Sequence, residues 1–409
     1  MKSLLLILQK AKDNLRDFSR RVSFKKTSPL VILGVLLGAA IALFPATYET
    51  EGLLSVVPFV GEREESVPSP VKVTHIRTPD AVKAIYMTSW VASTPKWRAE
   101  LARLVENTEL NAIVIDAKDY SGRISFAAED PYLKEIGVSD VRIPDIKEFL
   151  AALHEKDIYT IARITVFQDP FFAKKRPDLA VQKESDKSLW ADYKGLHYID
   201  PGALEAWDYT IRIAKESYAA GFDELNFDYI RFPSDGPMKD IFFPFSEARV
   251  VADPNLGKAK VMRDFFAYLH AELAGSGAVL SADLFGMTTT NADDLNIGQT
   301  LEYAAPYFDY LAPMVYPSHY PTGFIGYANP VEYPYEVVKY SMDRGVLKLT
   351  AAGIVSEKLR PWLQDFDYKA DYGATEVRAQ MQAVYDAGLT SWMLWDPANR
   401  YTRDALADE

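Results

Sequence analysis

The chain has 409 residues, of which 48% are hydrophobic and 13% aromatic, and this composition excludes a mainly disordered protein. The absence of cysteine excludes disulfides, thiolate metal sites and cysteine nucleophiles. Residues 1–28 carry eight Lys or Arg against two Asp, a net charge of +6, whereas the whole chain carries −12, so the remaining residues carry −18. We expect no nucleic-acid partner for so acidic a domain.

A charge-free stretch from Thr27 to Tyr48 follows the basic segment. A helix needs about 20 mostly apolar residues to span a bilayer, so residues 29–47 are predicted to be a transmembrane anchor. Because flanking Lys and Arg stay in the cytoplasm, residues 1–28 are expected there and the C-terminal domain outside, as a single-pass protein of the cell membrane. A signal peptide cleaved near Ala46 and a buried globular helix are the alternatives.

Residues 48–80 lose all hydrophobic periodicity. They carry the charge cluster GEREE and the proline-spaced run SVPSPVKV. Proline spacing and charge are typical of an extended linker, so this segment is predicted to be a stalk between the membrane and the domain at residues 81–409.

From residue 81 onward two patterns alternate. Short β-branched or aromatic runs predict strands at 84–90, 112–118, 159–167, 224–233, 279–286, 310–317, 348–355 and 391–397. Helix-like segments lie between them, among them 95–108, 143–156, 203–221 and 374–388. Eight alternating units predict a (β/α)8 TIM barrel. A doubly wound open sheet is the competing architecture, although no glycine-rich phosphate loop follows the first strand.

Polar residues at the strand ends predict where a site would lie. In FDELNFDYIRFP, at 222–233, alternation places Asn226 and Asp228 on one side of a strand that is otherwise apolar. Barrel strands are covered on both sides, but their C-terminal ends line a pocket. Asp116 and Asp283 occupy similar places in their strands, and Arg163 lies in the third strand. We therefore predict that Asp228, Asp283 and Asp116 are catalytic.

Two carboxyl groups across one pocket suit the cleavage of a glycosidic bond. One must be protonated to assist the leaving oxygen, while the other is ionised and acts as nucleophile or activates water. Burial and mutual repulsion can separate their pKa values. Either Arg163 or Arg231 would hold one of them ionised. The predicted substrate-binding residues are Trp90, Arg163, Asn226, Tyr316, His319 and Trp395, although core packing is the alternative for each aromatic one.

Other chemistries lack their residues. The five histidines are scattered singly, with no HExxH spacing, so neither a metal nor another cofactor is expected. No GxSxG motif is present, which excludes the usual serine hydrolase elbow. A structural Ca²⁺ held by carboxylates remains open.

Several motifs together resemble a known family. They are IYMTSW, NAIVIDAKDYSG, FDELNFDYIRFPSDG, SADLFGM, APMVYPSHY, RPWLQDF and WMLWDPANRYT, and they cover about residues 80–405. This set resembles the bacterial family of “putative glycosyl hydrolase” domains, which implies a TIM barrel that acts on glycans.

A more distant resemblance is to the α-amylase superfamily. It implies that Asp228 is the nucleophile after strand four and that Asp283 replaces the Glu acid after strand five. The superfamily's strand-four Arg is replaced here by Asn226, and only Glu357 lies near the place of its third acid. We therefore expect a membrane-anchored, extracytoplasmic glycoside hydrolase acting on a polysaccharide, with a non-catalytic glycan-binding barrel as the alternative.

Overall fold

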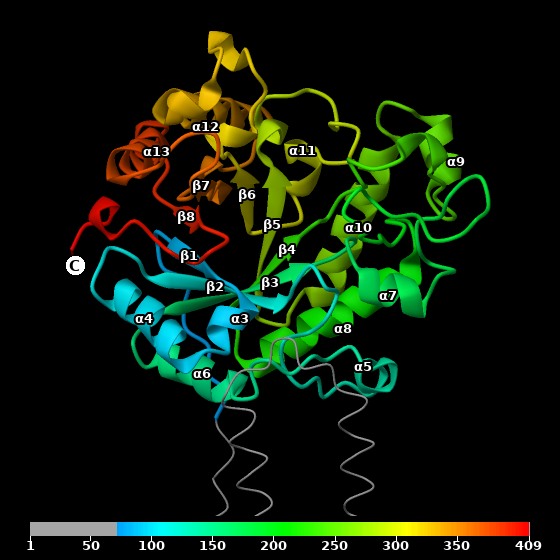
Figure 1. Cartoon of the computed structure of the whole chain (residues 1–409), viewed down its shortest axis with the longest axis horizontal. Helices are drawn as coiled ribbons and strands as arrows, with labels where there is room; N and C mark the ends of the chain where they lie inside the picture. Colours follow the sequence, from blue (N-terminus) through cyan, green and yellow to red (C-terminus); the bar gives the residue numbers. More distant parts are fainter. Residues whose placement is uncertain (1–71, 409) are drawn as a thin grey trace, which may run out of the picture. The chain divides into compact units, whose positions relative to one another are not determined.

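The computed structural model describes residues 72–408. Eight parallel strands form a closed barrel in which each strand pairs with the next and β8 pairs with β1 (Figure 1). The strands are β1 Lys83–Met87, β2 Ala112–Lys118, β3 Tyr159–Thr165, β4 Glu224–Asp228, β5 Val279–Phe285, β6 Tyr310–Met314, β7 Trp362–Gln364 and β8 Trp392–Trp395. The predicted TIM barrel is confirmed, and the open doubly wound sheet is excluded.

Helices surround the strands (Figure 1). The α-helices are α3 Ser89–Ala92, α4 Pro95–Glu106, α5 Pro131–Ile136, α6 Ile146–His154, α7 Pro170–Lys175, α8 Leu204–Ala220, α9 Glu247–Ala252, α10 Gly257–Leu273, α11 Leu301–Ala304, α12 Pro334–Ala351 and α13 Ala374–Asp386. Seven short 3-10 helices lie in the described loops, among them η3 Pro317–His319 and η6 Ser356–Lys358. The four helices predicted above correspond to α4, α6, α8 and α13.

The strands are apolar because both of their faces are covered. Every residue of β2 and β3 is buried, with isoleucine, valine and alanine packing inside the barrel or against the helices. Strands covered on both faces are expected to form nearly continuous hydrophobic runs. Polar residues of such strands lie in the barrel interior, at its C-terminal mouth or, like Thr160 of β3, against a covering helix.

The predicted seventh strand at 348–355 is wrong. Its first residues complete α12, whose buried positions Met342, Gly345 and Leu349 recur at helical spacing. The true strand is the three-residue segment Trp362–Gln364, which pairs with β6 through one register position and with β8 through three. So short a strand has no alternation from which it could be recognised.

Most of the N-terminal predictions concern residues outside the described range. The basic segment 1–28, the anchor 29–47 and residues 48–71 of the predicted stalk all precede residue 72. Residues 72–80 contact the N-terminal side of the barrel, where the backbone N–H of Ile76 donates to Asp223 at 2.8 Å and Thr78 bonds Tyr159 at 3.0 Å. Within 72–408 no helix is both long enough and apolar enough to cross a membrane.

A fully buried ion pair lies at the N-terminal end of the barrel. Arg360 Nη1 donates to both carboxylate oxygens of Glu224, at 2.8 and 3.0 Å, and its guanidinium stacks 3.8 Å from the ring centre of Tyr310. Tyr159 donates to Glu224 at 3.2 Å. The Nε and Nη2 atoms of Arg360 are buried without a partner in the described part of the chain, so Glu224 alone neutralises this cation.

Glu224→Gln is expected to lower the free energy of unfolding by about 3–5 kcal/mol, because it leaves a buried guanidinium without a counter-charge. Urea denaturation measures the change. The matched control is Glu184→Gln, which breaks the exposed pair with Lys187 and is expected to cost no more than about 1 kcal/mol. Equal unfolding midpoints for the two variants would contradict a structural role for the buried pair.

Candidate active site

The four consecutive strands β2 to β5 carry the predicted polar residues toward the C-terminal mouth of the barrel. In the register of the sheet, Asp116 of β2 is paired with Arg163 of β3, and Arg163 with Asn226 of β4. Asp228 is the last residue of β4, and Asp283 lies two residues before the end of β5. All five side chains are buried, so the polar interactions among them determine the chemistry of the site.

Arg163 bridges two of the carboxylates. Its Nε and Nη2 donate to Asp228 Oδ2 at 3.0 and 2.5 Å, and its Nη1 donates to Asp116 Oδ1 at 2.7 Å. Burial acts to lower the pKa of Arg163, but the charges of Asp228 and Asp116 raise it well above its usual value. Asp228 therefore accepts two charge-assisted hydrogen bonds from a permanently charged guanidinium. Of the two arginines left open by the sequence, Arg163 holds this carboxylate.

A strained residue follows Asp228. Tyr229 has φ of +52°, in the left-handed region that bulky residues rarely adopt. Its backbone N–H donates to Asp228 Oδ1 at 2.6 Å. β4 consequently ends at Asp228, five residues before the predicted end. Strain of this kind persists where surrounding structure holds it, and such residues cluster at functional sites.

Asp283 lies in a different environment. Its Oδ1 accepts hydrogen bonds from Trp362 Nε1 at 2.7 Å and Asn226 Nδ2 at 3.0 Å. Burial, followed by the negative charge of Asp228, raises the pKa of Asp283 to about 8, although Arg163 and the two hydrogen bonds oppose this. Asp283 is therefore mainly protonated at neutral pH, beside the carboxyl group of Asp228, which Arg163 engages.

Asp116 contacts two side chains of the site. It accepts hydrogen bonds from Arg163 and from the hydroxyl of Tyr86, the latter at 2.6 Å. Burial raises the pKa of Asp116, while Arg163 and Tyr86 act in the opposite direction. Asp116 is not among the residues that line the cavities described below. Its contacts position Arg163, and this geometry does not place it against a substrate.

Asp228 and Asp283 line one cavity of about 310 Å³. Of the residues predicted to bind substrate, Arg163, Tyr316, His319 and Trp395 line it with them. Burial lowers the pKa of His319, and the charge of Lys369 lowers it further, so its imidazole is neutral at neutral pH. This cavity therefore combines two carboxyl groups, a cation and aromatic walls.

Two predicted binding residues lie elsewhere. Asn226 is fully buried behind Asp283 and lines neither of the two cavities at the mouth. Trp90, on α3, is 59% exposed and lies outside the carboxylate cavity. The structure thus assembles four of the six predicted binding residues beside Asp228 and Asp283.

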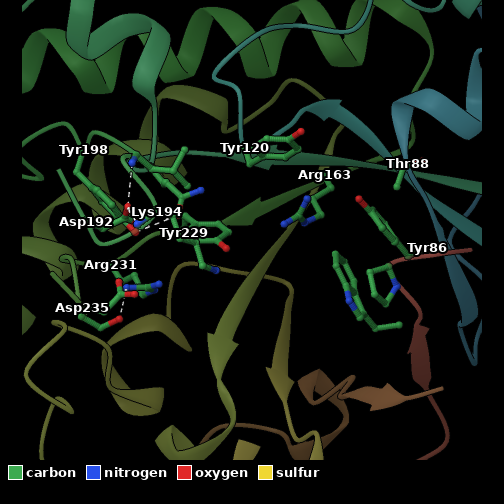
Figure 2. Close-up of a pocket in the computed structure, with 15 residues that line it drawn as sticks. Tyr86, Thr88, Tyr120, Arg163, Asp192, Lys194, Tyr198, Tyr229, Arg231 and Asp235 are labelled. Carbon is green, nitrogen blue, oxygen red and sulfur yellow. Dashed lines mark hydrogen bonds between the residues drawn. The ribbon is translucent and has the colours of Figure 1, made fainter. Parts of the chain in front are cut away.

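A larger cavity of about 680 Å³ adjoins the first one and shares Arg163, Tyr229, Arg231 and Trp395 with it. Figure 2 shows Tyr86 and Arg163 on one side of this cavity and Tyr198, Asp192 and Arg231 on the other. Arg231 donates to the carbonyl of Phe232 and to Ser234, so it does not contact a carboxylate in the described part of the chain.

Trp362 and Tyr86 also contact the carboxyl groups of the site, although neither was predicted from the sequence. Tyr86 stacks on Trp395 with ring centres 4.0 Å apart, and Trp362 meets Trp395 edge to face at 5.5 Å. Both side chains also hydrogen-bond a carboxylate, as described above. Trp362 lies in the motif RPWLQDF, and recognising this motif as the seventh strand would have placed its indole at the barrel interior.

The end of β7 also carries a carboxylate. Asp365 follows the strand directly and accepts hydrogen bonds from the hydroxyl and backbone N–H of Thr402, at 2.6 and 3.0 Å. Burial raises the pKa of Asp365 to about 6. Asp365 lines neither cavity at the mouth. Glu357, the residue considered for a third acid, is exposed on η6, which precedes β7 in the chain and so lies away from the site.

Metal chemistry has no evident ligand set here. Across residues 72–408, no group of three or more His, Asp or Glu side chains is arranged to hold a metal ion. The carboxylates at the mouth are instead engaged by Arg163, Asn226, Trp362 and Tyr86.

A closed parallel barrel with two unlike carboxyl groups in an aromatic-walled cavity at its C-terminal mouth defines the class: a TIM-barrel protein with a candidate site at the position where such barrels carry their active sites. A family model described as “Putative glycosyl hydrolase domain” matches residues 84–401. The chain belongs to this family, as its motifs indicated.

One of the similar solved structures supports the fold. The glycoside hydrolase domain of PgaB (BpsB) from Bordetella bronchiseptica is 16% identical, with a TM-score of 0.53 over 80% of this chain and 99% of that one. A hypothetical protein from Ruminiclostridium thermocellum is 33% identical over 49% of this chain and 96% of its own, with a TM-score of 0.43. A chitinase from Chromobacterium violaceum is 13% identical, with a TM-score of 0.47 over 80% and 96% of the two chains. No curated protein matches significantly.

Proposed function

We propose that this protein is a glycoside hydrolase that cleaves a polysaccharide with Asp283 as general acid and Asp228 as the ionised partner. The observation that carries the proposal is the unlike environment of two carboxyl groups in one cavity. Asp283 is buried and its pKa is raised, whereas Asp228 is engaged by the Arg163 guanidinium. Membership of the family and the barrel fold shared with a glycoside hydrolase domain support it.

In this mechanism, Asp283 donates its proton to the oxygen of the leaving sugar as the glycosidic bond breaks. Positive charge then develops on the sugar ring, and ionised Asp228 stabilises it. Asp228 acts either as nucleophile, forming a covalent glycosyl intermediate, or as the base that activates water. Arg163 orients Asp228 through its hydrogen bonds, and the indole of Trp362 orients Asp283 through its own.

Release of reducing ends from a panel of polysaccharides by the full chain tests the proposal. We expect hydrolysis of at least one member, with loss of activity in the Asp228→Asn and Asp283→Asn variants. Equal rates in the parent and both variants would show that a contaminating enzyme is responsible, and would refute the assignment.

One observation favours the second candidate, a barrel that binds glycan without cleaving it. Both oxygens of Asp228 are already hydrogen-bonded, Oδ2 by Arg163 and Oδ1 by the Tyr229 N–H. These bonds engage three of the four lone-pair sites of the carboxylate, so one site, on Oδ1, is left to attack a sugar carbon. Saturable binding of a glycan that the parent never cleaves would support this candidate over the first.

We further propose that the barrel lies outside the cell membrane, with residues 1–28 in the cytoplasm. The basic flank and the charge-free span at 29–47 support this orientation. Protease added to intact cells is expected to degrade the barrel. Degradation only after lysis would show that the barrel lies inside the cell, and would contradict the proposed topology.

Chelation is expected to leave hydrolysis unchanged, because acid and partner are both carboxyl groups that need no metal. The measurement is the initial rate before and after dialysis against EDTA. A loss restored by Ca²⁺ would indicate a structural ion held by loop oxygens. A loss restored only by a transition metal would contradict the mechanism.

A further inference from the structure

The carboxylate cavity is the first of three hollows that share lining residues in series, and this series is called the groove below. The carboxylate cavity shares four lining residues with the larger cavity, and Tyr120 lines both that cavity and a third hollow of about 280 Å³. Trp90 and Arg142 line this third hollow with Tyr120. Ligand pockets for molecules of drug size occupy about 300–1,000 Å³, so the groove has room for a molecule larger than one sugar.

Two large aromatic side chains are exposed at the outer end of the groove. Trp90 is 59% and Tyr120 58% exposed, and both border the third hollow. Figure 2 shows Tyr120 above the larger cavity, between Arg163 and the Tyr198 side. Burying these rings against a ligand would remove apolar surface from water, which stabilises a complex.

The Trp90 ring is held in place from behind. The Arg142 guanidinium packs 4.8 Å from the ring centre. Arg142 is itself buried and donates to Asp119, to Asp140 at 3.1 Å and to Ser89 at 2.6 Å. One face of the indole is therefore covered by a fixed cation, while the ring as a whole is largely exposed. An aromatic ring that is already fixed in its binding orientation loses little conformational entropy when a ligand binds.

The charges along the groove indicate an uncharged ligand. In the third hollow Asp119 and Asp140 balance Arg123 and Arg142. In the larger cavity, cations and carboxylates are interspersed, with Lys194 and Arg231 beside Asp192 and Asp235. A sugar ring offers an apolar C–H face to an aromatic platform and hydroxyls to such mixed polar walls, whereas a charged ligand would meet repulsion from half of them.

We infer that Trp90 and Tyr120 form a distal subsite that binds one unit of a neutral oligosaccharide, whose other end reaches Asp228 and Asp283. The position of the cleaved bond rests on the proposed function, but the subsite itself is defined by the groove and its two platforms. The substrate is thus a chain of several sugars, and affinity should increase with its length.

Calorimetry with cello-, xylo-, malto- and chito-oligosaccharides of two to six units, and with oligogalacturonates as the acidic series, tests the inference on the full chain and its Trp90→Ala and Tyr120→Ala variants. We expect the parent to bind at least one series more tightly as length increases. Each variant should weaken binding of the hexasaccharide by about 10-fold and leave the disaccharide unchanged, because truncating the ring removes apolar surface that the longer ligand alone would cover. The control is Tyr340→Ala, which removes an exposed ring on α12 that borders none of the three hollows.

Three results would overturn the inference: unchanged hexasaccharide binding in both variants, affinity independent of length, or binding confined to an acidic series such as oligogalacturonates. Failure of the proposed function has a different signature. Length-dependent binding without release of reducing ends would refute hydrolysis while leaving the subsite intact.

Discussion

Asp228→Asn is expected to lower turnover per folded molecule by at least about 10⁴-fold, the scale seen when an enzyme loses one member of a catalytic set. Asparagine has nearly the same size but cannot be ionised, so it can neither attack nor activate water. It also weakens the two hydrogen bonds from Arg163, and we expect a lower melting temperature. Glycan binding should persist. Turnover must therefore be measured with the folded fraction determined on the same preparation.

The matched control is Asp116→Asn. It breaks the other ion pair of Arg163, but Asp116 lines neither cavity at the mouth. We expect a comparable loss of stability with a much smaller loss of turnover. If Asp228→Asn is fully active while Asp116→Asn is not, the catalytic role moves from β4 to β2.

The second large effect concerns the acid. Asp283→Asn is expected to lower turnover by about 10²–10⁴-fold, as for other general acids. The loss should be much smaller for an aryl glycoside such as the 2,4-dinitrophenyl derivative, because that leaving group departs without a proton. Equal losses on both substrates would show that Asp283 is not the acid.

The pH profile follows from the same residue. Because the pKa of Asp283 is about 8, kcat/KM should fall as pH rises through about 8. The Trp362 hydrogen bond lowers this pKa, so Trp362→Phe should move the alkaline limb to higher pH. Trp392→Phe is the control, since that indole donates to Tyr385 instead of a carboxylate. An unshifted limb in Trp362→Phe would contradict the role given to the indole.

Stability should change over the same interval. An unfolded aspartate has a pKa of about 3.9, while folded Asp283 titrates near 8. Its contribution to stability is complete below about pH 4 and is lost as pH rises toward 8, because the unfolded chain ionises first. Asp283→Asn removes this loss. The melting temperature of the variant minus that of the parent should therefore be larger at pH 9 than at pH 4.

Local patterns predicted most of the barrel but not its least regular part. β2 and β3 each contain enough buried residues to be recognised alone. The seventh strand was misplaced because its three residues carry no periodicity, while Leu349 at the end of α12 belongs to an apolar helical face. Strand length therefore limited what could be predicted.

The candidate site was predicted in its residue types but not in its pairings. Alternation placed Asn226 and Asp228 on one side of a strand, yet it could not show that Asn226 contacts Asp283 and that Asp228 contacts Arg163. Those contacts depend on the register between neighbouring strands. The alternation of residues along a single strand does not reveal that register. The indole of Trp362 reaches Asp283 only because β7 begins where it does.

The central claim is that one carboxyl group is protonated beside another that is ionised. The most direct test is the pH titration of the Asp283 carboxyl carbon by ¹³C NMR, in the full chain labelled at aspartate and assigned by its absence in Asp283→Asn. We predict a midpoint near 8 that falls when Asp228→Asn removes the neighbouring charge. A midpoint in the ordinary aspartate range near about 4, unaffected by Asp228→Asn, would contradict the account.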